Sequence, residues 1–160
     1  LLSTSTRVVA TEATSDHENL GSIFRNAAGL GLDGVVLDER TADPLYRRCV
    51  RVSLGWSAVL PHARCASLGE TASVFADAGF RTVALCPHIG VPVDEAAATG
   101  VFDDRIALLL GAEGPGLDDD TIDASDAVVR IPMAGAADSL NVATAFAVVA
   151  AFAAARRGWR

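Results

Sequence analysis

Lysine is absent from this 160-residue sequence, and all 13 of its basic residues are arginines. The absence of lysine excludes a phosphate-binding P-loop in its usual form, because that loop ends in Gly-Lys-Ser or Gly-Lys-Thr. Together with 20 acidic residues, the arginines give a formal net charge of −7. This balance is unpromising for a nucleic-acid enzyme, and we expect these residues alone to bind RNA only weakly.

Cysteine is scarce and scattered. Cys49, Cys65 and Cys86 are far apart and odd in number, which argues against a disulfide framework. We expect reduced thiols that are at least partly buried. His88 follows Cys86 at two residues' distance, but a lone Cys-Pro-His does not have the ligand spacing of a zinc site. We therefore expect no bound metal.

Long apolar runs and an initiator methionine are also missing. No run approaches the roughly 20 residues needed to span a bilayer, and residues 1–10 lack the organisation of a signal peptide. We expect a cytoplasmic protein with no membrane segment. The only methionine is Met133, and the chain begins at Leu1 inside an ordinary-looking segment. We expect a single domain over residues 1–160, a fragment that lacks an N-terminal RNA-binding domain.

Apolar runs that read as buried strands alternate with helical segments along the whole chain. The runs are continuous, which is typical of an α/β fold whose mostly parallel sheet carries helices on both faces. We expect strands at residues 7–13, 35–37, 58–60, 82–86, 106–110 and 127–131. We expect helices at residues 19–30, 43–50, 68–78, 94–98, 119–124 and 139–157. Asp43 before Pro44 predicts the N-cap of the second helix.

Gly29, Gly31 and Gly34 match the G-x-G-x-x-G pattern of dinucleotide-binding proteins, but in the reverse context. They follow a helix and precede a strand, so no helix N-terminus is available for a pyrophosphate. A helix end and a tight turn account for all three glycines. An ordinary nucleotide-binding enzyme using this segment stays an alternative, which detectable NAD binding would revive.

Three polar or glycine-rich corners occur in the second half of the chain. Strand 106–110 ends in a glycine-rich stretch at residues 111–116, and strand 127–131 ends in Pro132 and Met133. A Ser-Leu-Asn triplet at residues 139–141 opens the last helical segment. The carboxyl ends of parallel strands meet at one edge of a sheet, so we expect the three corners to converge there.

The chemistry of these corners fits a small-molecule site. Glycines let the backbone approach a ligand closely. Leu110, Ile131, Met133 and Leu140 could supply apolar walls, although the residues alone favour ordinary core packing.

Three sequence blocks stand out together: Asn19–Arg25 (NLGSIFR), Leu109–Leu117 (LLGAEGPGL), and Ile131–Met133 (IPM) with Ser139–Ala143 (SLNVA). In this order they resemble the catalytic domain of the SpoU/TrmH family of RNA ribose 2′-O-methyltransferases, within the SPOUT class. The resemblance covers nearly the whole chain.

The resemblance implies a C-terminal deep trefoil knot of the SPOUT type, a feature so rare that periodicity could not have predicted it. It also implies that S-adenosylmethionine binds bent inside the knot and leaves as S-adenosylhomocysteine, with no metal required. The implied partners are an RNA substrate, tRNA or rRNA, and a second copy of the chain in a homodimer whose subunits both complete the active site. A catalytically inactive, cofactor-binding RNA-binding or assembly module of the same fold is the alternative.

The resemblance places the cofactor against backbone and apolar side chains at the ends of three strands and the start of the last helix. These positions are Leu85, Cys86, Pro87, Leu110, Gly111, Ala112, Glu113, Gly114, Ile131, Met133, Ser139 and Leu140.

Methyl transfer to ribose requires a hydroxyl that loses its proton near the transition state. By resemblance, Arg25 promotes that loss. Arginine stays protonated in water, so we favour stabilisation of the developing alkoxide over action as a base. The resemblance also assigns Asn19, Glu113, Ser139 and Asn141 to ordering the site, with Glu113 ordering Arg25. A surface salt bridge for Arg25 and helix-start roles for Asn19, Ser139 and Asn141 are the alternatives.

Two arginine clusters could bind RNA phosphate, because guanidinium groups pair bidentately with it. A helix C-terminus accounts equally well for the second cluster. Ser53 is a weaker candidate for contact with RNA or with the partner subunit. The clusters are Arg47, Arg48 and Arg51, and Arg156, Arg157 and Arg160.

Overall fold

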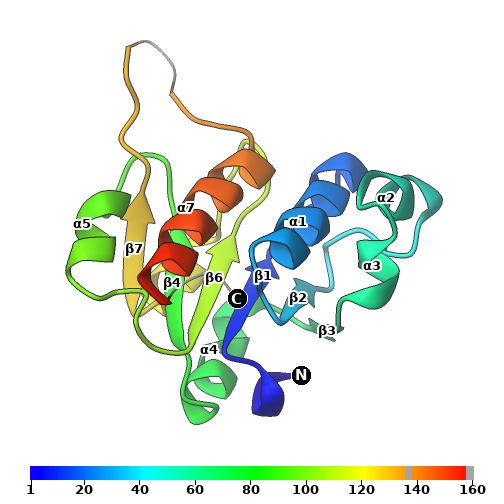
Figure 1. The fold of residues 1–160 in the computed structure, drawn as a ribbon, viewed down its shortest axis with the longest axis horizontal. Helices are drawn as coiled ribbons and strands as arrows, with labels where there is room; N and C mark the ends of the chain where they lie inside the picture. The colour runs from blue at the N-terminus through cyan, green and yellow to red at the C-terminus, as the bar shows by residue number, and fades with distance from the viewer. Residues whose placement is uncertain (136–137, 158–160) are drawn as a thin grey trace.

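Seven strands form one sheet in the order β3-β2-β1-β6-β4-β7-β5 in the computed structural model, which describes residues 1–135 and 138–157 (Figure 1). Every neighbouring pair is parallel, as predicted. The strands are β1 (Arg7–Thr11), β2 (Gly34–Asp38), β3 (His62–Cys65), β4 (Arg81–Leu85), β5 (Val91–Pro92), β6 (Ile106–Leu110) and β7 (Ala127–Arg130).

Helices cover both faces of the sheet, because each face carries its own layer of apolar side chains. One buried cluster joins the sheet to Phe24, Ala96 and Phe146, and the other joins it to Leu68 and Phe75. In Figure 1, α1 and α7 lie side by side on the first of these faces. The helices are α1 (His17–Gly29), α2 (Arg47–Val52), α3 (Trp56–Val59), α4 (Leu68–Asp77), α5 (Val93–Ala98), α6 (Asp119–Asp123) and α7 (Val142–Arg157).

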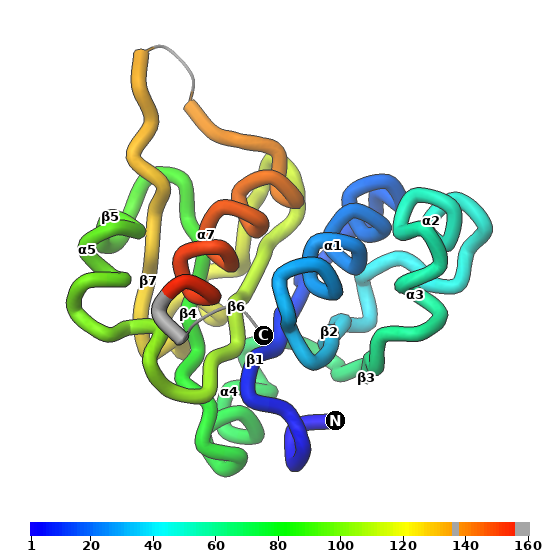
Figure 2. The backbone as a smooth tube through the Cα atoms, viewed as in Figure 1, coloured from blue at the N-terminus to red at the C-terminus, as the bar shows by residue number. Residues whose placement is uncertain are grey.

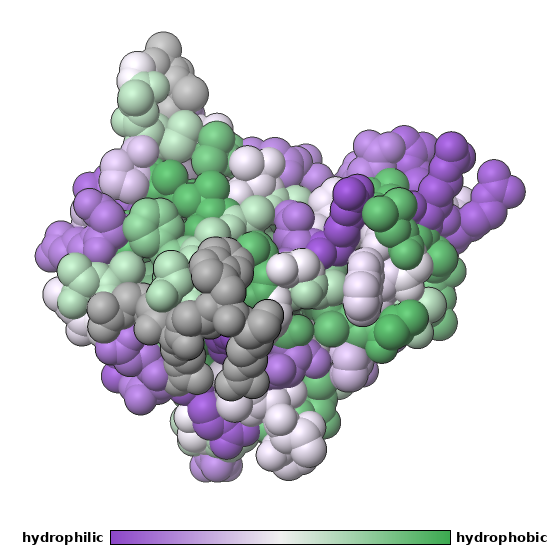
Figure 3. Space-filling view, in the orientation of Figure 1, coloured by the Kyte–Doolittle hydropathy of each residue, from purple (hydrophilic) through white to green (hydrophobic). Residues whose placement is uncertain are grey.

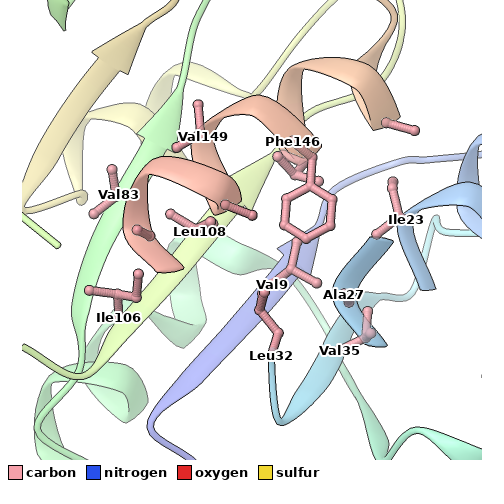
Figure 4. Close-up of a cluster of buried hydrophobic side chains, with 14 of the residues drawn as sticks. Val9, Ile23, Ala27, Leu32, Val35, Val83, Ile106, Leu108, Phe146 and Val149 are labelled. Atoms are coloured by element: carbon pink, nitrogen blue, oxygen red, sulfur yellow. The ribbon is translucent and has the colours of Figure 1, made fainter. Parts of the chain in front are cut away.

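Phe146 fixes α7 on the sheet. Its ring is fully buried and points from α7 toward Val9 of β1, next to Leu108 of β6 (Figure 4). Asn26 of α1 adds a polar link by donating from Nδ2 to the carbonyl oxygen of Ala143 at 3.0 Å. Together these contacts hold the start of α7 above the carboxyl ends of the central strands.

The first helix begins two residues before the predicted start. The side chain of Asp16 accepts hydrogen bonds from the amides of Glu18 at 2.6 Å and Asn19 at 3.0 Å, and is therefore the N-cap. The interpretation of Asn19 as the cap is wrong. At the other end, the chain turns at Gly31 (φ +72°) and enters β2 at Gly34, as the reversed glycine pattern predicts.

The second helix begins later than the Asp43-Pro44 pair predicts. Asp43 Oδ1 accepts from the amide of Leu45 at 2.8 Å, so its side chain closes a turn instead of capping a helix. The helix runs over Arg47–Val52, and no side chain in the described part of the protein caps its start.

The strand predicted at residues 58–60 is wrong. These residues end the short helix α3, whose start is fixed by the hydroxyl of Ser53 accepting from the amide of Ser57 at 3.1 Å. Ser53 is fully buried, so it does not present its side chain to RNA or to a partner. The edge strand in this region is β3, whose half-exposed sequence contains no continuous apolar run.

The three cysteines are at least partly buried, as predicted. Cys49 and Cys86 are buried, Cys65 is partly buried, and all three are free thiols whose pKa is raised by burial. Within residues 1–135 and 138–157, no helix is long and apolar enough to cross a membrane. The side chains of the second arginine cluster, Arg156, Arg157 and Arg160, lie outside the described residues.

Candidate active site

A cavity of about 510 Å³ lies at the carboxyl ends of β4, β6 and β7, against the start of α7. The segments that follow β7, residues 131–135 and 138–141, rise above this edge of the sheet before the chain enters α7 (Figure 2). The three predicted corners therefore converge. The residues predicted to hold a cofactor all line the cavity: Leu85, Cys86, Pro87, Leu110, Gly111, Ala112, Glu113, Gly114, Ile131, Met133, Ser139 and Leu140.

Gly116, part of the glycine-rich stretch predicted to approach a ligand, also lines the cavity, and so do five residues that were not assigned to it from the sequence. His88 adds an imidazole to the wall. The others are aliphatic and belong to the continuous apolar pattern of β7 and α7, so no local signal separates them from core residues. They are Val129, Val142, Ala145 and Val149.

The glycine-rich loop after β6 is folded tightly onto itself. The amide of Ala112 donates to the carbonyl of Gly116 at 3.1 Å, and the amide of Gly116 donates back at 3.0 Å. A Cβ added at Gly111 would lie 2.0 Å from the carbonyl carbon of Gly116 and 2.1 Å from the amide nitrogen of Leu117. No side chain fits there, so the backbone itself forms this wall of the cavity.

Asn141 joins three elements at the mouth of the cavity. Its Nδ2 donates to Asn19 Oδ1 of α1 and to Glu113 Oε1 of the glycine-rich loop, both at 2.8 Å. Its Oδ1 accepts from the amides of Ala143 at 3.0 Å and Thr144 at 3.3 Å, so Asn141 is also the N-cap of α7. Asn141 therefore serves both as helix cap and as the link between Asn19 and Glu113.

Ser139 lines the cavity as predicted, but it does not begin the last helix. Helix α7 begins at Val142, so Ser139 precedes the helix by three residues. Its side chain is exposed on the cavity lining.

Arg25 lies outside the cavity. It is exposed on α1, in a second groove that it shares with residues of α2. Within the described chain, Arg25 makes no ion pair or side-chain hydrogen bond, so the expected contact with Glu113 and the alternative salt bridge are both unformed. Glu113 accepts from Asn141 instead.

A buried carboxylate, missed from the sequence, anchors the far end of the glycine-rich loop. Glu12 is 1% exposed and accepts from the amide of Asp118 and the hydroxyl of Thr121, each at 2.8 Å. Arg40 bridges it at 3.4 Å and also contacts Asp118 at 2.7 Å and Asp38 at 3.0 Å. The sequence signal was an acid inside the predicted strand 7–13, close to the end of its apolar run.

Metal ligands are not grouped in the described part of the chain. Among residues 1–135 and 138–157, no three His, Cys, Asp or Glu side chains lie close enough to hold an ion together.

The chain is similar to known RNA methyltransferases over nearly all of its length. The profile of the SpoU rRNA Methylase family matches residues 6–151. An uncharacterized tRNA/rRNA methyltransferase of Mycobacterium tuberculosis is 51% identical over 141 residues, which are 88% of this chain and 49% of that protein. The chain thus spans about half the length of the curated relatives it matches.

Solved structures with the same fold include proteins with cofactor bound. The SpoU methyltransferase AviRb of Streptomyces viridochromogenes, in complex with AdoMet, superposes with a TM-score of 0.82 at 32% identity, covering 94% of this chain and 60% of that one. The AdoMet-bound rRNA methyltransferase of Sinorhizobium meliloti gives a TM-score of 0.85 at 32% identity, covering 96% and 57%. An RNA 2′-O ribose methyltransferase gives 0.82 at 27% identity, covering 94% and 56%.

Proposed function

The chain belongs to the SpoU rRNA methylase family, and from that premise we propose that it transfers a methyl group from S-adenosylmethionine to a ribose 2′-hydroxyl of tRNA or rRNA. The observation that carries the proposal is the cavity at the sheet edge, whose walls combine bare backbone with apolar side chains and whose mouth holds the Asn19–Asn141–Glu113 link. The 2′-hydroxyl is favoured because one solved relative is named a 2′-O ribose methyltransferase.

The residues of the cavity fit S-adenosylmethionine. A volume of about 510 Å³ is within the range of small-molecule sites. The glycine-rich loop offers amides and carbonyls that a Cβ at Gly111 would displace, and Leu110, Ile131 and Leu140 offer apolar surface. When bound, the cofactor supplies a methyl group carried on a positively charged sulfur.

The position of Arg25 supports a homodimer. Because Arg25 faces a groove and not the cavity of its own chain, we propose that it acts at the cavity of the partner subunit. The same region exposes an unusual set of large apolar side chains, between 44% and 70% accessible, that a partner could cover. They are Leu45, Tyr46, Leu54, Trp56 and Val59.

In the proposed reaction, the guanidinium of Arg25 lies beside the ribose hydroxyl and stabilises negative charge on the oxygen as its proton leaves to water. Glu113 and Asn19 receive both amide protons of Asn141, so their positions relative to α7 are fixed before substrate binds. We propose that Ser139, which is exposed on the cavity lining, contacts the cofactor or the ribose.

We also propose the SPOUT trefoil knot for the C-terminal part. Its support is the family resemblance together with the strand order, in which β6 lies between β1 and β4, and β7 lies between β4 and β5.

The test is methyl transfer from radiolabelled S-adenosylmethionine to total tRNA and rRNA, followed by nucleoside analysis. We expect 2′-O-methylated nucleosides, and we expect Arg25→Ala to abolish transfer while its affinity for S-adenosylhomocysteine stays within about twofold of wild type. Methyl groups on bases would contradict the ribose assignment. Cofactor and RNA binding without any transfer would identify the inactive module instead.

A further inference from the structure

Three arginines line one groove of the protein. None of them pairs with another side chain in the described part of the chain. Arg25 of α1 and Arg47 and Arg51 of α2 line it together. Within residues 1–135 and 138–157, none of the three makes an ion pair or a side-chain hydrogen bond. This region is strongly hydrophilic at the upper right of Figure 3, over α2 and the segment leading into it.

Six other arginines of the described residues do have carboxylate or carbonyl partners. Arg40, Arg48 and Arg81 pair with carboxylates, and Arg64, Arg105 and Arg130 donate to backbone carbonyls. The net charge of −7 makes unpaired guanidinium groups still less expected. Their collection in one groove therefore indicates a ligand that carries negative charge.

The spacing on α2 supports the same conclusion. Arg47 and Arg51 are four residues apart, so their side chains leave the helix on the same face and repel each other. An anion between them removes that repulsion. A phosphodiester matches two such forks well, because each guanidinium can donate two parallel hydrogen bonds to phosphate oxygens.

We propose that this groove binds the sugar-phosphate backbone of the RNA strand beside the methylated nucleotide. The inference rests on the proposed function, which puts Arg25 next to the reacting hydroxyl. Arg47 and Arg51 share the groove with Arg25, so the phosphates they hold flank the target ribose.

Glu18 limits the charge of this groove. It also lines the groove, and its Oε1 accepts from Nε of Arg48 at 3.0 Å and from Nη2 of the same side chain. This ion pair engages Arg48, the fourth arginine of the groove, and neutralises its positive charge. Replacing Glu18 by Gln leaves Arg48 free for phosphate, so this change strengthens RNA binding.

The test is fluorescence anisotropy with a labelled, unstructured 12-nucleotide RNA between 20 and 300 mM NaCl. Each phosphate contact contributes about 0.7 to the slope of log affinity against log salt for a single strand, which is about fivefold in affinity at 0.1 M relative to 1 M. We expect Arg47→Gln/Arg51→Gln to lower the slope by about 1.4 and weaken binding about 25-fold at 0.1 M salt. We expect Glu18→Gln to strengthen binding up to about fivefold.

Arg81→Gln is the matched control, because it removes one arginine at the amino end of β4, away from the groove. It should leave both affinity and slope unchanged. A single-stranded DNA of the same length should lose as much affinity as RNA in the double variant, because phosphate contacts carry no base or sugar readout.

Wild-type slope and affinity in the double variant, or a wild-type chain that does not bind the RNA at 20 mM salt, would overturn the inference. Titration of each variant with S-adenosylhomocysteine separates this failure from failure of the proposed function. Intact cofactor binding with an unaffected RNA slope rejects only the groove.

Discussion

Gly111→Ala tests whether the tight glycine-rich loop forms the wall of a ligand site. The new Cβ would lie 2.0 Å from the carbonyl carbon of Gly116, whereas ordinary contact begins at 3.4 Å, so that peptide must withdraw by about 1.4 Å. The obstacle is backbone, which cannot rotate away as a side chain would.

The cost follows from what the withdrawal breaks. Overpacking of this kind costs about 1–3 kcal/mol. The two reciprocal hydrogen bonds between Ala112 and Gly116 contribute about 0.5–1.5 kcal/mol each. A total of about 2–6 kcal/mol is a large part of the 5–15 kcal/mol typical of a domain, and only its upper end exceeds the stability of the least stable domains. We expect the chain to fold with a displaced loop. Restoring the native loop for the cofactor then costs at least about 2 kcal/mol, which weakens cofactor binding at least about 30-fold.

The assay is calorimetric titration with S-adenosylhomocysteine, paired with urea unfolding of each variant. Gly29→Ala is the control, because Gly29 ends α1 without a positive φ and a Cβ added there would meet no described atom within 4 Å other than those of its chain neighbours and its own helix backbone. It should keep wild-type affinity and gain up to about 1 kcal/mol of stability. Wild-type affinity and stability in Gly111→Ala would show that the backbone at Gly111 does not form a wall of the cofactor site.

Two further predictions address the site and the fold. Asn141→Ala removes the amide that joins α1 to the glycine-rich loop, so we expect at least a tenfold loss of methyl transfer and about 1 kcal/mol of stability from the lost cap; Asn141→Asp keeps the cap oxygen and should recover stability but not transfer. Burial acts to raise the pKa of Asp33, but hydrogen bonds from the amides of Thr6 and Arg7 and from the Thr6 hydroxyl outweigh it and lower that pKa. Its stabilising contribution is therefore present above its unfolded pKa of about 3.9 and is lost as pH falls through the folded value. Asp33→Asn should lower the free energy of unfolding at pH 7 and flatten its acid dependence, measured by urea unfolding from pH 2.5 to 7; an unchanged acid dependence would reject this assignment.

The central part of the fold could be predicted because buried parallel strands are continuous apolar runs. Strands β1, β6 and β7 and helix α4 lie within two residues of their predicted bounds. The cavity lining could also be predicted, because the carboxyl ends of parallel strands meet at one edge of the sheet. The glycines after β6 indicated that the backbone approaches a ligand there. The family blocks then supplied the chemistry.

The missed features depend on contacts between distant parts of the chain. β5 contains two residues and exists only through its pairing with β7. The interaction of Glu12 with Thr121 spans 109 residues, and that of Asn141 with Asn19 spans 122. Local patterns carry no information about such partners. The edge region around α3 and β3 failed for another reason, because half-exposed segments dilute the apolar periodicity on which the prediction relied.

The most direct measurement is calorimetric titration of the chain with S-adenosylhomocysteine, with NAD as the control ligand. All the residues proposed to hold the cofactor lie within these 160, so the measurement requires no further segment. We expect about one site per chain for S-adenosylhomocysteine and no binding of NAD. Absence of binding to the folded chain, or binding of NAD in its place, would contradict the proposal that this cavity holds S-adenosylmethionine.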